Sequence, residues 1–149
     1  MSGPENFDDL NIREDILRGV YAYGFEKPSA IQSQAIPTVI EGKDIIAQAQ
    51  SGTGKTGAFA ISTLCRIDPK LKRTQSLILA PTHELADQIF TVIKEISNYS
   101  EISILKVVGK TSVNQCARDL STDPQVIVGT PGRVLDMIQK NYLHTDSLK

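Results

Sequence analysis

The stretch that decides the fold is Ala49-Gln50-Ser51-Gly52-Thr53-Gly54-Lys55-Thr56, which directly follows the apolar run Asp44–Ala47. Small residues between a strand and a helix let backbone N–H groups crowd round a polyphosphate, and the helix start points its positive end at the anion. Lys55 brings a positive charge to the outer phosphates, and Thr56 offers a hydroxyl to Mg²⁺. The octapeptide therefore predicts a nucleoside-triphosphate loop in which Lys55 and Thr56 are the catalytic pair. The strict pattern starts with Gly, and Ala49 fits it only where that position needs no positive φ.

Beyond this loop, short apolar runs alternate with helical patterns. Strands are expected at residues 45–47, 76–80, 102–108 and 125–128, and helices at 55–67, 113–120 and 133–139. A further helix after Pro81 carries an apolar stripe at helical spacing from Leu85 to Ile96. Such alternation predicts an α/β domain with a parallel sheet and flanking helices.

The loops after the predicted strands are short and contain polar residues or glycine. They are Gln48–Gly54, Pro81–His83, Gly109–Thr111 and Thr130–Gly132. Each could be a plain turn. Because the carboxyl ends of parallel strands meet at one edge of the sheet, a shared ligand site there is the better interpretation.

The chain ahead of the loop has a different pattern. Asn11 with Glu14 predicts a helix start, and Gly24 predicts its end. A second helix is expected from Pro28 and Ser29 up to Pro37. We expect residues 1–23 to form an N-terminal segment and residues 24–149 a partial nucleotide-binding domain.

Composition restricts the possible functions. The chain has 149 residues, a formal net charge of −1 and 40% hydrophobic residues, which suits one soluble domain. This charge argues against a generally basic nucleic-acid coat but leaves room for a local basic groove. No apolar run is long enough to span a bilayer. Cys65 and Cys116 fit no metal spacing and fall on predicted helices, so reduced thiols in a cytoplasmic or nuclear protein are expected.

Several segments together resemble the DEAD-box RNA helicases. Gly24–Gln32 is similar to the adenine-reading Q motif of that family, Phe7 to its upstream aromatic, and Ala49–Thr56 to its phosphate loop, initial Ala included. Pro81–Ala86 resembles motif Ia and Thr130–Arg133 motif Ib, in the family's order. The resemblance covers nearly the whole chain. It is closest to the helicases of the eukaryotic translation-initiation complex through residues 7–9, 21–32 and 47–56.

The resemblance implies a RecA-like P-loop domain that binds ATP and Mg²⁺. Gln32 would read adenine, since a side-chain amide can pair bidentately with the exocyclic amine and N7. It could instead cap its own helix, because Ser29 stands three residues before it. Phe25 is expected in the adenine pocket, with a core position as the alternative. The residues implied to bind ATP are Phe7, Phe25, Lys27, Gln32, Ala49, Gln50, Ser51, Gly52, Thr53, Gly54, Lys55 and Thr56, the last also holding Mg²⁺.

The family resemblance also implies that one RNA strand is held by its sugar-phosphate backbone. Hydroxyls, helix-start N–H groups and arginine suit that chemistry and carry no sequence preference. Arg133 could alternatively be a solvated residue or a salt-bridge partner. The residues implied to bind RNA are Pro81, Thr82, His83, Gly109, Lys110, Thr130, Gly132 and Arg133.

Two positions depart from the family's pattern. His83 stands where motif Ia normally has Arg, so we expect weaker RNA binding that strengthens below about pH 6.5. Lys110 replaces the second of two paired glycines. It would strain or block the site if that position has positive φ or abuts the RNA, and it would otherwise add a phosphate contact.

The third departure is that the chain ends at Lys149, before the strand that would carry Asp-Glu-Ala-Asp. We expect a helicase of translation initiation with scaffold or activator proteins as partners, whose residues 1–149 alone do not turn over ATP. The missing strand would leave unpaired sheet edges and an uncovered apolar face. The alternatives are a non-catalytic ATP-, RNA- or partner-binding module and, less favoured, another P-loop nucleotidase.

Overall fold

The computed structural model describes residues 7–10, 12–25, 36 and 53–148. The chain divides into two compact units, Met1–Arg66 with Val92–Glu101 and Ile67–Thr91 with Ile102–Lys149. The first unit is helical where it is described, and the second carries the sheet. The predicted strand at 45–47 and the predicted helix from Pro28 lie outside the described residues, apart from Ile36, which is helical and fully buried.

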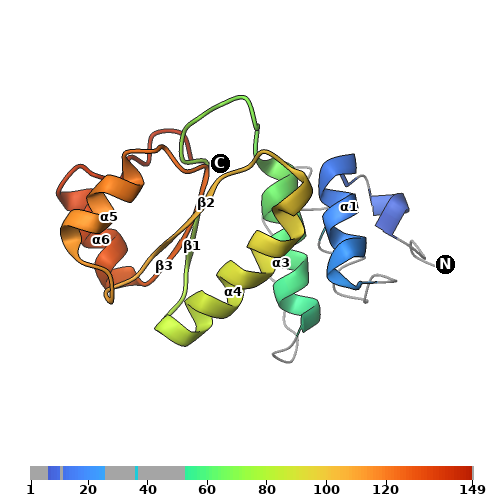
Figure 1. The fold of residues 1–149 in the computed structure, drawn as a ribbon, viewed down its shortest axis with the longest axis horizontal. Coiled ribbons are helices and arrows are strands. Elements are labelled where there is room, and N and C mark those ends of the chain that lie inside the picture. The colour runs from blue at the N-terminus through green and yellow to red at the C-terminus, as the bar shows by residue number, and fades with distance from the viewer. Residues whose placement is uncertain (1–6, 11, 26–35, 37–52, 149) are drawn as a thin grey trace. The chain divides into compact units, whose positions relative to one another are not determined.

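The sheet of the second unit has three parallel strands, β1 (Ser76–Leu79), β2 (Ile104–Val107) and β3 (Val126–Gly129), in the order β1-β3-β2 (Figure 1). β3 lies in the middle and is buried along its whole length, as expected for an apolar run in a parallel sheet. The predicted α/β class and parallel sheet are confirmed, and each described strand lies within two residues of its predicted limits at either end.

The two faces of the sheet are covered by different helices. α5 (Val113–Leu120) and α6 (Pro131–Gln139) pack on the face that carries Val107 and Ile127, and Cys116 and Met137 are buried there. On the other face, Lys106 of β2 contacts Asp87 and Phe90 of α4 (His83–Ile96). The alternation of side chains along each strand therefore gives the unit its helix–sheet–helix layering.

The first unit packs α1 (Glu14–Tyr23) against α3 (Thr53–Arg66) and against the short turn η2 (Ser97–Tyr99). Gly19 allows the closest approach, because a Cβ there would lie 1.7 Å from the carbonyl oxygen of Ile96. Phe7 and Leu10 of η1 (Phe7–Leu10) are fully buried in this unit. None of the helices in the described ranges combines the length and apolarity needed to cross a membrane.

The ends of α1 test two predictions. Gly24 adopts a left-handed φ of 115° and donates its N–H to Tyr21, so the predicted stop is confirmed. The predicted start at Asn11 is wrong, because the helix begins at Glu14 with Arg13 as its N-cap and no side-chain cap. Asp15 instead accepts from the N–H of Ile16, a local bond that takes the place of a cap.

At the edge where the strands begin, two fully buried glutamines bind the loop between α3 and β1. Gln75 Nε2 donates to the carbonyls of Asp68 and Leu71, at 2.9 and 2.8 Å. Gln125 Nε2 donates to the carbonyl of Leu71 at 3.0 Å, and Gln125 Oε1 accepts from the N–H of Ser103. These side chains supply the buried hydrogen-bond partners that a loop lacks by itself.

Candidate nucleic-acid interface

The carboxyl ends of all three strands meet at one edge of the sheet. Leu79 and Val107 both pair with Gly129, so the three strands finish level with one another. Directly after these ends come the loops that precede α4, α5 and α6. Three helix N-termini therefore gather where the sequence predicted a ligand edge.

The loop before α4 presents Pro81 and Thr82 to solvent. Thr82 Oγ1 accepts from the N–H of Leu85 at 3.2 Å, so this hydroxyl serves the start of α4. His83 lies beside the next loop, since a Cβ on Gly109 would be 3.7 Å from its Nε2. Motif Ia and the loop after β2 are therefore adjacent.

Gly109 and Lys110 are exposed. Among the described residues, only Asp123, Asn141 and Gly24 have positive φ, so Lys110 is in an ordinary conformation. The positive φ under which Lys110 would strain its backbone is therefore not present. The choice between a residue that blocks RNA and one that contacts phosphate stays open.

Arg133 reaches from the first turn of α6 into the loop after β2. Its Nη1 donates to the carbonyl of Thr111 and, at 3.2 Å, to Cys116 Sγ, and its Nη2 donates to the carbonyl of Gly109 at 3.3 Å. The side chain is half-buried. Neither alternative weighed from the sequence, a solvated residue or a salt bridge, describes these contacts.

The other motif Ib residues differ in access. Thr130 is 8% exposed and forms the N-cap of α6 without a side-chain cap bond, while Gly132 is exposed and a Cβ added to it would meet no atom within 4 Å. Gly129, just before them, has no room for a side chain, because a Cβ would lie 2.5 Å from both the Val107 carbonyl oxygen and Val134 Cγ2. This close approach sets α6 against the strands and brings Arg133 to its loop.

Sequence reasoning missed an acidic group near this edge. Asp87 pairs with Lys106 at 2.6 Å, and Lys106 also lies over the ring of Phe90, 5.4 Å from its centroid. The hydrogen bond from Lys106 holds the pKa of Asp87 below its usual 3.8, against an opposing effect of desolvation. The charges of Lys106, Lys110 and His83 add smaller contributions that also lower this pKa. Because Asp87 pairs with Lys106 and Arg133 binds the loop after β2, the basic side chains left for an anion in the described part of this edge are His83 and Lys110.

The residues predicted to bind ATP belong to the first unit and are described only in part. Phe7 is fully buried, with its ring centroid 6.0 Å from Tyr21 and 6.1 Å from Phe25. Lys27, Gln32 and residues 49–52 lie outside the described residues, as do the side chains of residues 53–56, including Lys55 and Thr56. What the structure describes is the helix of 14 residues, Thr53–Arg66, whose first residue belongs to the predicted phosphate loop.

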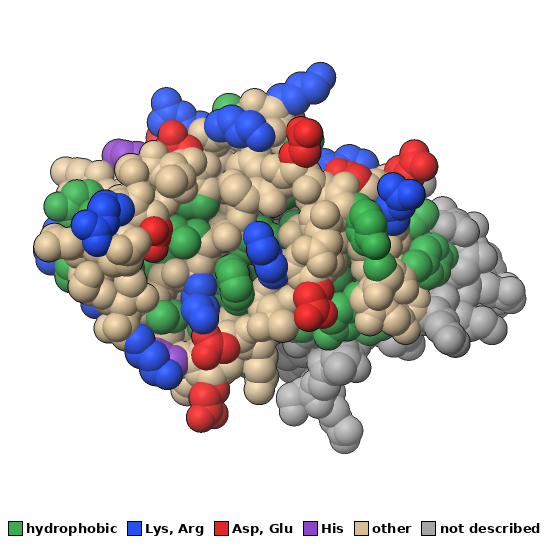
Figure 2. Space-filling view, in the orientation of Figure 1, with side chains coloured by type: hydrophobic (Ala, Val, Ile, Leu, Met, Phe, Trp, Pro, Cys, Tyr) green, Lys and Arg blue, Asp and Glu red, His purple; other side chains and the backbone are tan. Residues whose placement is uncertain are grey.

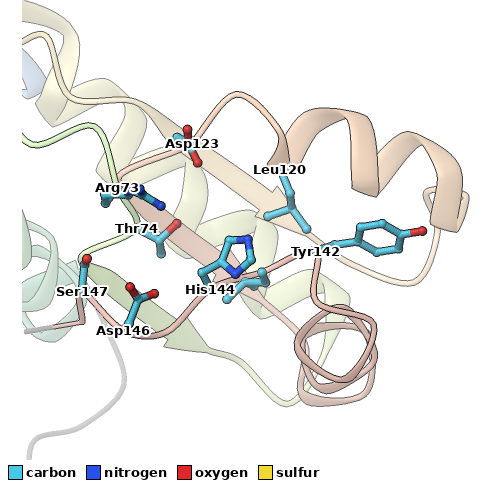
Figure 3. A pocket seen from close by; sticks show the side chains of 9 residues that line it. Arg73, Thr74, Leu120, Asp123, Tyr142, His144, Asp146 and Ser147 are labelled. Carbon is cyan, nitrogen blue, oxygen red and sulfur yellow. The ribbon is translucent and has the colours of Figure 1, made fainter.

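A small cavity lies at the opposite, amino edge of the sheet, between Arg73, Asp123 and the segment after α6 (Figure 3). Its free volume of about 10 Å³ has room for no more than about one water molecule. Figure 3 shows that polar side chains, among them Thr74, His144 and Asp146, surround it. The cavity is too small for a nucleotide, so the carboxyl edge remains the candidate site.

Comparisons with known proteins agree with this arrangement. The family model described as DEAD/DEAH box helicase matches residues 29–149. The ATP-dependent RNA helicase eIF4A of Neurospora crassa is 57% identical over 145 residues, 97% of this chain but 36% of the relative. The chain thus spans about a third of the length of the curated relatives it matches.

Solved structures give the same result for the fold. S. cerevisiae Dbp5 bound to RNA and ADP BeF3 superposes with a TM-score of 0.89 at 36% identity, covering 98% of this chain and 37% of that one. A DEAD box protein from Methanococcus jannaschii superposes with a TM-score of 0.89 at 32% identity, covering 99% and 40%.

Proposed function

Since the chain belongs to the DEAD/DEAH box helicase family, we propose that it works as the ATP- and RNA-binding part of an ATP-dependent RNA helicase of translation initiation. The observation that carries the RNA part is the carboxyl edge of the sheet. There, His83, the Gly109–Thr111 loop and Arg133 come together at three helix N-termini. Backbone N–H groups and a few cations are the chemistry that binds a sugar-phosphate strand without reading bases.

The role of each residue along this edge follows from its exposure to solvent. Pro81, Thr82, Gly109, Lys110 and Gly132 are exposed and would lie along the strand. Thr130 is nearly buried, so its part would be played by the backbone at the start of α6. Family members distinguish RNA from DNA through 2′-hydroxyls, and we expect the same preference here.

In the first unit, ATP would be held by the loop before α3. The helix start at Thr53 suits the phosphates, with Lys55 and Thr56 supplying charge and a hydroxyl for Mg²⁺, and Gln32, Lys27, Phe25 and the loop residues completing the site. Bound Mg²⁺ would neutralise charge on the phosphates. Phe7 would support the adenine pocket from behind, through its contact with Phe25. Activator or scaffold proteins in the cytoplasm are the expected partners.

RNA binding at the carboxyl edge is tested with a labelled single-stranded RNA and two matched charge reversals. Lys110→Glu puts a negative charge beside the proposed strand and should weaken binding about fivefold or more. Lys140→Glu makes the same change at the far end of α6, where Lys140 pairs with Asp136 at 3.2 Å, and should have little effect. Equal losses in both variants would contradict a site at this edge. Lys110→Gly then separates the open alternatives: tighter binding means that Lys110 obstructs RNA, and weaker binding that it contacts phosphate.

The second candidate function is a binding module without turnover. The share of the relatives that this chain spans favours it for residues 1–149 alone. We expect no RNA-stimulated ATP hydrolysis by these residues in a steady-state assay, and robust turnover would overturn that expectation. Acceptance of GTP as readily as ATP would instead favour a different P-loop nucleotidase.

A further inference from the structure

Arg133 is engaged by the protein itself. Its guanidinium donates to two backbone carbonyls of one loop, Gly109 and Thr111, and to the thiol of Cys116 on α5. Three of its five N–H groups are thereby used. A side chain whose main task is to pair with phosphate would keep its planar fork free for the ligand.

Within the described parts of the chain, few other hydrogen bonds hold the loop that Arg133 binds. The N–H of Thr111 donates to the carbonyl of Val108 at a long 3.4 Å, and Gly109 and Lys110 are exposed. The fork of Arg133 therefore contributes the charge-assisted bonds that fix where the loop lies. Gly129 makes this reach possible, since α6 lies against β2 and β3 at a distance that leaves no room for a Cβ.

The same contacts change the charge at the edge. Carbonyl oxygens carry partial negative charge and would repel a phosphate nearby. Arg133 binds the carbonyls of Gly109 and Thr111, which turns both of them toward α6 and compensates their charge. The loop is then shaped and neutralised before any RNA arrives, which lowers the ordering cost of binding.

We propose that Arg133 is a positioning residue, which acts on RNA by fixing the Gly109–Thr111 loop through its two carbonyls rather than by pairing with a phosphate. The RNA part of this inference rests on the proposed function. The statement that Arg133 fixes the loop does not depend on the proposed function, and the experiments below test the loop and RNA binding separately.

Limited proteolysis measures how firmly the Gly109–Thr111 loop is held, because trypsin can cleave the Lys110–Thr111 bond inside it. Arg133→Lys keeps the charge but loses the fork, and cleavage after Lys110 should become about tenfold faster, as expected when bonds to a charged group are lost. Arg118→Lys is the matched control, because Arg118 donates to Gln115 Oε1 on the exposed side of α5 and does not touch the loop. Unchanged cleavage after Lys110 in Arg133→Lys overturns the proposal whether or not the chain binds RNA.

RNA binding supplies the second readout. Arg133→Lys should bind single-stranded RNA about tenfold more weakly, while the slope of log affinity against log salt stays as in the parent chain. A phosphate contact predicts the reverse: affinity largely kept in Arg133→Lys, and a slope about 0.7 smaller in Arg133→Gln. Absence of RNA binding in the parent chain would refute the proposed function, and the proteolysis result would still decide the loop.

If Arg133→Lys fails to fold, NMR of the parent protein with ¹⁵N-labelled arginine tests whether Arg133 is bonded to the loop. The Arg133 Nη protons should be resolved and slow to exchange, since three of them are bonded. Averaged signals like those of a solvated arginine would overturn the proposal.

Discussion

At the scale of single residues, one ion pair removes a lysine from the charges available at the carboxyl edge. Asp87 takes Lys106, and the Phe90 ring lies under the same ammonium group. This leaves His83 and Lys110 as the cations that an anion could meet without first breaking a contact within the described part of the edge. One acidic side chain thus decides which positive charges stay available.

The Asp87–Lys106 pair gives a pH prediction. The carboxyl of Asp87 should titrate below its usual pKa of 3.8, and Lys106→Met should move that pKa back toward 3.8. Because the folded pKa is the lower one, the pair's stabilising contribution is present above pH 3.8 and is lost as the pH falls through the lowered value. A carboxyl-detected NMR titration measures the pKa of Asp87 in the parent protein and in Lys106→Met. Lys94→Met is the control, because Lys94 lies on the same helix as Asp87. An unchanged midpoint in Lys106→Met would contradict the assignment.

At the scale of elements, the close seating of α6 depends on one glycine. Gly129→Ala places a Cβ 2.5 Å from the backbone oxygen of Val107, so strand or helix must shift. We expect a loss of about 1–3 kcal/mol in the free energy of unfolding, measured by urea denaturation. Gly132→Ala is the control, since it meets no atom within 4 Å and lies in a helix, where Ala is favoured over Gly by up to about 1 kcal/mol. Similar losses in the two variants would show that crowding is not the cause.

The elements were also the level at which sequence reasoning worked best. Apolar runs and helical spacing predicted β1, β3, α4 and α5 closely, because burial on both faces or on one stripe leaves a local signature. The start of α1 was missed, since Asp15 replaces a conventional cap by a bond to its neighbour's N–H. The loop contacts of Arg133 had no local signal at all. They join residues more than twenty positions apart and required the three strands to be in register first.

The same limit applies to the candidate site. Polar residues after apolar runs located its loops, and the resemblance assigned their roles. The burial of Thr130 and the pairing of Lys106 with Asp87 depend on tertiary packing, which the spacing of residues in the sequence does not reveal. The ATP-binding roles of Gln32, Lys55 and the other loop residues stay predictions.

At the scale of the whole molecule, the face shown in Figure 2 has mixed charge. Lysine and arginine side chains lie there among aspartate and glutamate, and no continuous basic surface is seen on this face among the described residues. The formal net charge of the sequence is −1. Under the proposed function, Lys110 is the exposed lysine of the carboxyl edge that RNA phosphates would meet, so few charge contacts are expected.

This gives a prediction for salt dependence. With Lys110 as the phosphate contact, the slope of log affinity against log salt should be about −0.7 at pH 7.5. Fluorescence anisotropy across a salt series at pH 7.5 measures this slope. A slope of about −4 would contradict the prediction and point to a larger basic surface.

The buried glutamines at the other edge have a consequence for how freely the chain can change. Gln75 and Gln125 donate hydrogen bonds to main-chain carbonyls of Asp68, Pro69 and Leu71. These contacts depend on the backbone path of the loop and not on the identity of its side chains. The side chains of Lys70, Lys72 and Arg73 are exposed beside these contacts and take no part in them. We therefore expect substitutions in that stretch to be tolerated, and it is a convenient place for attaching a fluorophore or an affinity handle away from the carboxyl edge.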